Sequence, residues 1–165
     1  GYKWLMGPYS IGVAYFGPRY DDGVPLEESW MSREGSRDFA GLVDQGDAYR
    51  PGAVRFDVGE SANFILVPML VAALEQVLDW GVERIQDYCR ELCGPFFTGA
   101  GHLFGLRLPP DVDPAEVRSE LSRRNVFVSV RGRAIRVSPH LYNDAADMEA
   151  LAGALRDCGT SATVI

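Results

Sequence analysis

Lysine is almost absent from this chain of 165 residues. Of its 16 basic residues, Lys3 is the single lysine and all the others are arginines. Arginine therefore supplies positive charge nearly everywhere it is needed. A lysine in this background points to tasks that arginine cannot perform, above all forming a Schiff base, which requires an amine able to lose its proton. The alternative is an ordinary solvated lysine at a surface turn.

Cysteine and histidine are also scarce, with three and two residues. An odd and small number of cysteines argues against a disulfide framework and predicts a reducing compartment, the cytoplasm. Cys89 and Cys93 are four residues apart on a predicted helix, where they are expected in the core. Without more cysteine or histidine ligands they form no zinc site, so we expect no metal.

Long apolar runs and excess positive charge are missing as well. No stretch approaches the ~18 apolar residues of a membrane helix, and no signal-peptide pattern is visible, which predicts a protein that does not bind a membrane. The net charge of −7 argues against nucleic acid as a partner. Most of the acidic excess lies in residues 21–60, with ten acidic and four basic side chains.

The first third of the chain shows little periodicity. Residues 13–16 predict a buried strand because they are apolar on both faces. Residues 18–60 are rich in Gly, Asp, Arg and Pro, and such a long irregular stretch in a compact domain usually carries function. Residues 1–60 contain too few strands to form a core of their own. The chain is therefore expected to be a fragment of a longer protein.

The remainder shows regular patterns of helices and strands. Apolar residues at three- and four-residue steps predict a helix after Asn63, broken at Gly81, and a second helix that ends at Gly94. Asp113 and Pro114 begin a further helix, and Asn143 or Asp144 begins the last one, which Gly159 ends. Strands are predicted over residues 102–108, 126–130 and 134–138. This order predicts a small antiparallel sheet with helices on one side.

The segment around Lys3 reads YKWLMGPYSIG. This run resembles the cofactor-lysine segment of class V aminotransferase-fold enzymes, which depend on pyridoxal 5'-phosphate (PLP) and have fold type I. The family pattern is a lysine, an aromatic or apolar pair and Gly-Pro, with Tyr2 here where histidine is common and Ser10 where glycine is common. The resemblance implies that Lys3 holds PLP as an internal aldimine. The apolar neighbours Trp4 and Leu5 are expected to lower the pKa of its amine.

Two further segments carry the resemblance. RFDVGESANF (55–64) is similar to the loop that helps hold the cofactor phosphate, which makes Ser61 and Asn63 candidate cofactor ligands. The alternative for these residues is simple helix capping. Glu60 replaces a small hydroxyl residue, and its carboxylate would repel a phosphate.

AIRVSPHLYND (134–144) is similar to the strand whose arginine binds the substrate carboxylate. Arg136 matches that arginine. Strand alternation places Arg136 opposite to Ile135 and Val137, and a bidentate carboxylate is a natural partner for it. A structural salt bridge is the alternative. His140 follows and could face the same site.

Taken over the whole chain, the resemblance implies an α/β fold. Residues 1–80 would complete the large PLP-binding domain, and residues 81–165 would form the small C-terminal α+β domain. The implied protein is a homodimeric PLP enzyme acting on an amino acid by transamination, epimerisation or β-cleavage. The family's ring-holding Asp and stacking residue would precede Gly1, so the fragment alone is expected to be inactive. A non-catalytic remnant of the fold, or an interaction module, is the alternative.

Overall fold

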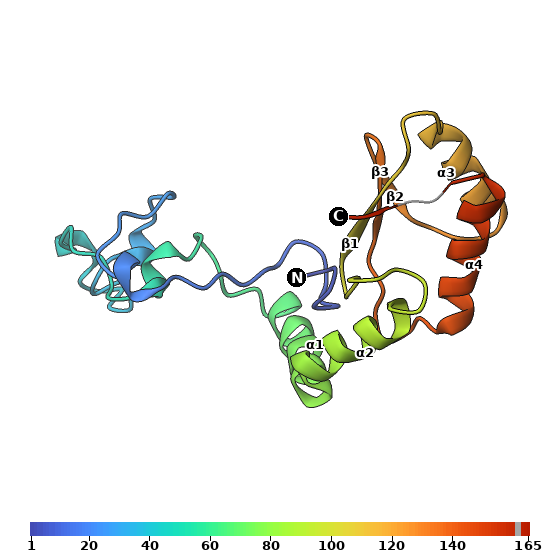
Figure 1. Cartoon of the computed structure of the whole chain (residues 1–165). Coiled ribbons are helices and arrows are strands. Elements are labelled where there is room, and N and C mark those ends of the chain that lie inside the picture. The colour runs from blue at the N-terminus through green and yellow to red at the C-terminus, as the bar shows by residue number, and fades with distance from the viewer. Residues whose placement is uncertain (161–162) are drawn as a thin grey trace. The chain divides into compact units, whose positions relative to one another are not determined.

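The computed structural model describes residues 1–160 and 163–165, and the chain divides into two compact units, 1–76 and 77–165 (Figure 1). The division falls inside helix α1 (Leu66–Trp80). The assignment of the two halves to a large and a small domain stays a prediction. No helix within the described residues is long and apolar enough to cross a membrane.

The second unit is a mixed α/β domain built on a four-stranded antiparallel sheet with strand order β2-β3-β1-β4. Helices α3 and α4 lie on the same side of this sheet (Figure 1). The predicted small antiparallel sheet with helices on one side is confirmed. The elements are α2 (Val82–Cys93), β1 (Phe104–Arg107), α3 (Pro114–Arg123), β2 (Ser129–Arg131), β3 (Ala134–Val137), α4 (Ala145–Asp157) and β4 (Thr163–Val164).

Local capping explains where the two covering helices begin. The Asp113 side chain accepts a hydrogen bond of 2.8 Å from the backbone N–H of Ala115. At α4, Asp144 accepts from the N–H groups of Ala146 and Asp147, and the Asp147 side chain accepts in return from the Asp144 N–H. Such reciprocal capping satisfies amides that a helix N-terminus otherwise leaves without partners. Both predicted helix starts are confirmed.

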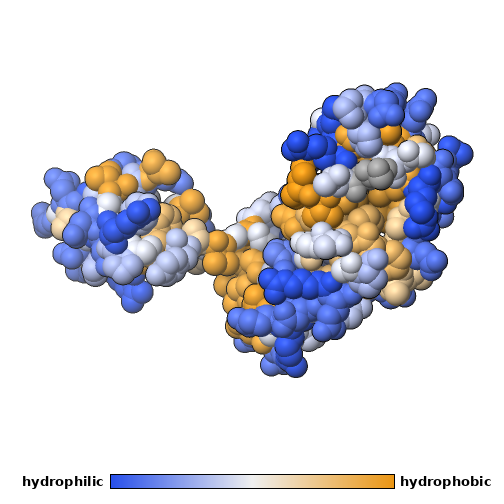
Figure 2. Space-filling model, in the orientation of Figure 1, coloured by the Kyte–Doolittle hydropathy of each residue, from blue (hydrophilic) through white to orange (hydrophobic). Residues whose placement is uncertain are grey.

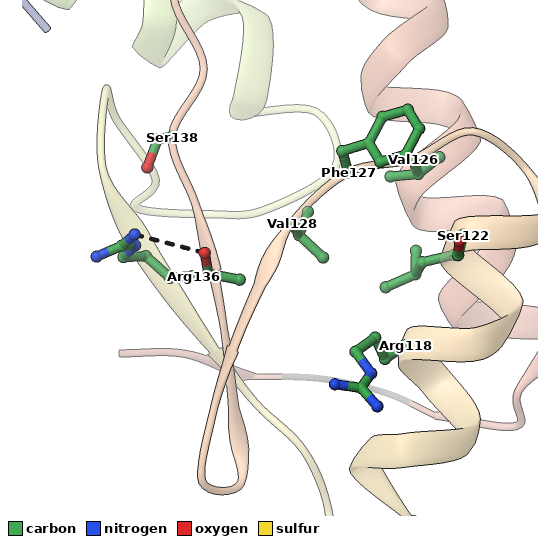
Figure 3. Close-up of a pocket in the computed structure, with 9 residues that line it drawn as sticks. Arg118, Ser122, Val126, Phe127, Val128, Arg136 and Ser138 are labelled. Carbon is green, nitrogen blue, oxygen red and sulfur yellow. Dashed lines mark hydrogen bonds between the residues drawn. The ribbon is translucent and has the colours of Figure 1, made fainter. Parts of the chain in front are cut away.

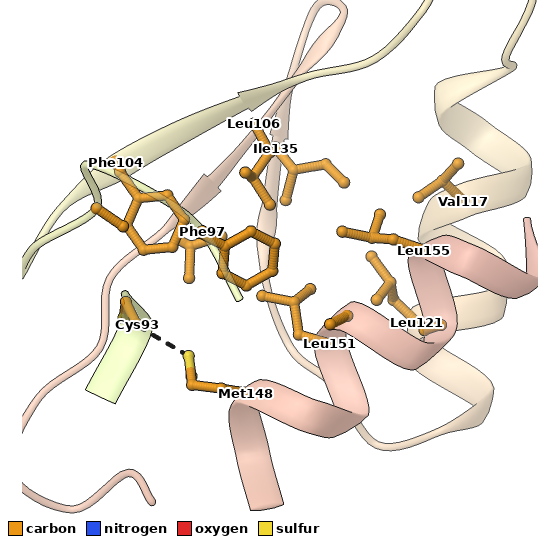
Figure 4. Close-up of a cluster of buried hydrophobic side chains, with 14 of the residues drawn as sticks. Cys93, Phe97, Phe104, Leu106, Val117, Leu121, Ile135, Met148, Leu151 and Leu155 are labelled. Carbon is orange, nitrogen blue, oxygen red and sulfur yellow. Dashed lines mark hydrogen bonds between the residues drawn. The ribbon is translucent and has the colours of Figure 1, made fainter. Parts of the chain in front are cut away.

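The core lies between the helix-covered face of the sheet and helices α3 and α4 (Figure 4). Leu106 and Ile135 from the sheet meet Leu121 of α3 and Leu151 of α4, and all four side chains are buried. Strand alternation makes this possible, since every second residue of β1 and β3 points to the helices. Helix α2 adds Cys93 to the same cluster.

Two sequence expectations about strands need correction. Residues 13–16 do not form a buried strand: they pair with no strand in the described chain, and Tyr15 is 88% exposed. Strand β2 covers Ser129–Arg131 rather than 126–130, because pairing with β3 begins opposite Arg136. Strand β4 was not predicted, since two residues carry no periodicity.

The first unit is irregular up to α1, as predicted for residues 18–60. It contains four short 3₁₀ helices, Pro18–Tyr20, Trp30–Ser32, Leu42–Asp44 and Ala53–Phe56. Polar contacts fold this stretch: buried Arg55 donates hydrogen bonds to the carbonyls of Arg50 and Gly23. Arg33 pairs with Glu28 at 2.7 Å and lies over the ring of Tyr49.

Apolar side chains of the first unit are largely exposed. Figure 2 shows apolar residues spread over the surface. Leu26, Tyr15 and Phe64 are almost fully exposed, while Leu70 of α1 is buried. The expectation that residues 1–60 form no core of their own is therefore confirmed for the described residues.

The packing predicts a sharp contrast between two leucines of one segment. Leu106 is fully buried in the core, whereas Leu103 is 55% exposed. We expect Leu106→Ala to lower the free energy of unfolding of the second unit by about 2–5 kcal/mol, because it leaves a cavity. Leu103→Ala, the matched control, should change it by less than about 0.5 kcal/mol. Urea unfolding followed by circular dichroism measures both, and equal effects would contradict this core.

Candidate functional site

The segment that carries Lys3 forms a small closed loop. The N–H of Gly7 donates to the carbonyl of Gly1, and the N–H of Met6 donates to the carbonyl of Lys3, both at 2.9 Å. A Cβ at Gly7 would lie 2.6 Å from Leu70 Cδ1, so the loop backbone rests directly on helix α1. The absent side chain of Gly7 permits this approach.

Lys3 presents its amine on the outside of this loop. The side chain is exposed, and its Nζ lies 5.4 Å from the centre of the Tyr2 ring, which in turn stacks on Tyr9. No carboxylate in the described part of the chain pairs with the amine. The expected apolar enclosure of Lys3 is wrong for these residues. The amine is accessible and bears on an aromatic face instead.

Backbone strain gathers in the two segments that the resemblance singles out. Met6 and Ser10, which flank the Gly7-Pro8 turn, have φ of 56° and 66°, and Glu60 has φ of 55°. Residues other than glycine rarely adopt this left-handed region, and each such residue costs on the order of 1–3 kcal/mol. Strain of this kind is found more often at ligand sites than in plain connecting loops.

An open groove of about 1080 Å³ brings these two segments together with α1. Its lining includes Ser10 from the lysine segment and both predicted cofactor ligands, Ser61 and Asn63. The carboxylates of Asp57 and Glu60 line it as well, and no lysine or arginine is among its described lining residues. The groove thus offers hydroxyl and amide donors, but its charge opposes an anion.

Asn63 caps helix α1. Its Oδ1 accepts hydrogen bonds from the N–H groups of Ile65 and Leu66, at 3.2 and 2.8 Å. The capping interpretation is therefore confirmed for this residue. The amide NH₂ of Asn63 and the hydroxyl of exposed Ser61 are the donors left for a ligand. Binding of a cofactor by either residue stays a prediction.

Arg136 lies on the face of the sheet opposite to helices α3 and α4. Its neighbours Ile135 and Val137 are buried against the helices, so Arg136 points the other way. Ser129 is its direct partner on β2 and accepts a hydrogen bond from Arg136 Nη2 at 3.4 Å. Within residues 1–160 and 163–165, no carboxylate pairs with this guanidinium. A structural salt bridge, the alternative interpretation, is thus not formed there.

A pocket of about 430 Å³ adjoins this arginine, with Arg118 and three serines, Ser122, Ser129 and Ser138, in its lining. Figure 3 shows that the two arginines lie on opposite sides of the β2–β3 hairpin, with Arg118 on the side of α3. Arg118 therefore does not share the face of Arg136.

The predicted site residues are divided between the two units. Lys3, Ser61 and Asn63 belong to the first unit and Arg136 to the second.

The cysteines are unsuited to chemistry. Cys89 and Cys93 are completely buried, as expected, and burial raises the pKa of the Cys93 thiol from 9.0 to about 11. Burial also raises the pKa of Cys89 and of Cys158. All three are free thiols, and the described residues contain no cluster of ligands for a metal ion. A thiol that stays protonated is a poor nucleophile.

The histidines have structural surroundings. His140 is buried between Trp80 and Tyr142, with its ring stacked on that of Tyr142 at 5.6 Å. His102 is exposed and its Nδ1 contacts the side chain of Gln86. A place for His140 in the site of Arg136 stays a prediction.

Arg107 and Arg131 lie on the same sheet face as Arg136, which the sequence alone did not indicate. Alternation along each strand shows which residues share a face only when the register between the strands is known. That register places Arg107 and Arg131 opposite Ala134, on the same face as Arg136.

This chain is similar to an enzyme among the known proteins. The isopenicillin N epimerase of Amycolatopsis lactamdurans is 29% identical to it over an alignment 187 positions long. The alignment covers 95% of this chain and 45% of the epimerase. The chain thus spans less than half the length of that relative. No protein-family model matches it. The match gives loose support to the resemblance to class V aminotransferase-fold enzymes.

The burial of Cys93 predicts a loss of stability in alkali. The unfolded chain releases this thiol proton near pH 9, while the folded chain keeps it up to about pH 11. Stability from this group is complete below pH 9 and should fall as the pH rises through that window. Urea unfolding across the window measures the slope. Cys93→Ala should make the free energy of unfolding depend less on pH in this window, whereas the control Cys158→Ala should keep most of the dependence. An unchanged dependence in Cys93→Ala would refute the raised pKa of Cys93.

Proposed function

We propose that the chain is the C-terminal part of a PLP-dependent enzyme that acts on an amino acid. The observation that carries the proposal is the accessible amine of Lys3, the single lysine of the chain, held on a closed loop at α1. The relative named as an epimerase, which matches 95% of the chain, supports it. The guanidinium of Arg136, which pairs with no described carboxylate, adds a group able to bind a carboxylate.

The residues present suit PLP in part. Lys3 supplies an amine for covalent attachment of the cofactor, and Ser61 and Asn63 supply neutral donors for its phosphate. Asp57 and Glu60 oppose that phosphate, so cationic or helix-terminal groups outside this groove must balance its charge. PLP, when bound, supplies an electron-accepting ring that stabilises negative charge at the substrate α-carbon.

The chain's own side chains would divide the remaining work. Arg136 binds the substrate carboxylate through two parallel N–H donors and thereby fixes the orientation of the α-carbon. Ser129 holds the guanidinium from the neighbouring strand. The amine of Lys3 would accept and return the α-proton of the substrate. Among the possible reactions, epimerisation is favoured, since the relative carries that name.

We further propose a homodimer in the cytoplasm. Exposed apolar side chains run along and before α1, including Phe64, Ile65 and Met69. Exposed apolar surface of this kind is typical of interfaces. Three free thiols accord with a reducing compartment.

Lys3→Arg provides the most specific variant of the proposed anchor. It keeps the positive charge and removes the amine that can lose its proton. In protein expressed from the complete gene, Lys3→Arg should abolish the visible absorbance of bound cofactor and reduce turnover by at least about 10³-fold. Lys3→Ala should do the same. A control, Arg37→Lys in the exposed loop, should change neither, and full absorbance in Lys3→Arg would exclude the assignment.

The reaction type can be read from hydrogen exchange. In heavy water an epimerase exchanges the α-hydrogen of its amino-acid substrate and inverts the centre, without forming a keto acid. NMR and chiral chromatography of a panel of amino acids incubated with the complete protein distinguish these outcomes. We expect exchange together with inversion. Keto-acid formation would indicate transamination instead, and fragment release would indicate β-cleavage.

The second candidate is a non-catalytic remnant of the fold that serves in binding. The carboxylates of Asp57 and Glu60 at the predicted phosphate groove favour it. This candidate requires that amino acids cause no change in cofactor absorbance.

A further inference from the structure

Three arginines share the face of the small sheet that lies opposite to helices α3 and α4. Arg131 on β2 and Arg107 on β1 both lie opposite Ala134 of β3. Arg136, two residues after Ala134, points to the same face because side chains alternate along a strand. Each of the two outer arginines is therefore a diagonal neighbour of Arg136. Such neighbours lie about 7–8 Å apart, within reach of long side chains.

The surface between these arginines carries no charged residue of β1 or β3. Ala134 lies at the centre, and Gly105 is the β1 partner of Arg136. A Cβ at Gly105 would lie 2.8 Å from Cγ1 of Ile165, so this position admits no side chain without a shift of its neighbour. The three cations thus surround Ala134 and Gly105, and the side chain of Ile165 lies over Gly105.

The three arginines lack the charged or carbonyl partners that several other arginines of the unit have. Arg124 pairs with Glu120 and Asp157, and Arg133 donates to the carbonyls of Pro109 and Val112. By contrast, the side chains of Arg107 and Arg131 make no ion pair or hydrogen bond with any described residue, and the guanidinium of Arg136 contacts only a hydroxyl.

The other described strand residues of this face include no acid, since they are Gly105, Ser129, Ala134 and Thr163. Neighbouring like charges destabilise a sheet. A bound anion would remove that repulsion.

We propose that this arginine face, formed by Arg107, Arg131 and Arg136, binds a small molecule with two anionic groups. Arg136 takes one carboxylate, and Arg107 and Arg131 hold the second anionic group of the same molecule. That this ligand is the substrate rests on the proposed function. If that function holds, the substrate class is an amino acid with a second carboxylate. Arg107 and Arg131 then determine specificity.

Binding of a dicarboxylate and its matched monocarboxylate tests the arginine face directly. Adipate and hexanoate have the same number of carbons and differ in one carboxylate. Isothermal calorimetry on protein expressed from the complete gene should show adipate binding at least about tenfold more tightly, as expected for added hydrogen bonds between charged groups. Equal affinities, or no binding of adipate, would overturn the proposal.

Single substitutions test whether Arg107 and Arg131 bind the second carboxylate of adipate. Arg107→Gln and Arg131→Gln should each lower the affinity for adipate and leave that for hexanoate nearly unchanged. The double variant should bring the two affinities within about twofold of each other. Arg136→Gln should weaken both ligands. Arg156→Gln on α4, which removes the same charge away from the face, should alter neither; a preference for adipate that persists in the double variant would refute the assignment.

The binding test of the arginine face can fail or succeed independently of the test that Lys3 carries a cofactor. Carboxylate binding needs no turnover, so the arginine face can be confirmed even if Lys3 proves not to hold a cofactor. Conversely, cofactor bound to Lys3 together with equal affinities for adipate and hexanoate would leave the enzyme assignment in place and remove the second carboxylate from its substrate.

Discussion

Burial of one side of strand β3 is the constraint on which the second unit depends. Ile135 and Val137 are held against α3 and α4, and a shift of one residue would place them in solvent and Arg136 in the core. Hydrophobic packing therefore sets the register of the sheet. The same register presents Arg136, Arg107 and Arg131 on the opposite face. Ligand chemistry on this face follows from apolar packing on the other.

The first unit is organised by a different principle. Its loops are held by polar contacts, with Arg55 bound to two carbonyls and Arg33 paired to Glu28, while many apolar side chains remain exposed. Such a segment gains little from burial and depends on hydrogen bonds that are each worth about 1 kcal/mol. Its strained residues Met6 and Glu60 lie where a ligand is proposed. This pattern suits a surface completed by other parts of a protein.

The sequence predicted the elements of the second unit well because capping and periodicity are local signals. Asp113 and Asp144 marked the helix starts, and alternation around Arg136 gave its orientation. Strand β4 and the partners of Arg136 could not be predicted, since both depend on pairing between distant segments. Residues 13–16 were misread because apolar residues indicate a buried strand only where a partner exists. The exposure of Lys3 likewise depends on how its loop folds, whereas its apolar neighbours suggested the opposite.

Chemical trapping shows whether Lys3 carries the cofactor. Protein expressed from the complete gene would be incubated with PLP, reduced with borohydride, digested and sequenced by mass spectrometry. We expect a pyridoxyl group on Lys3, within the peptide that contains Trp4 and Leu5. A pyridoxyl group confined to another amine, or absent altogether, would contradict this expectation.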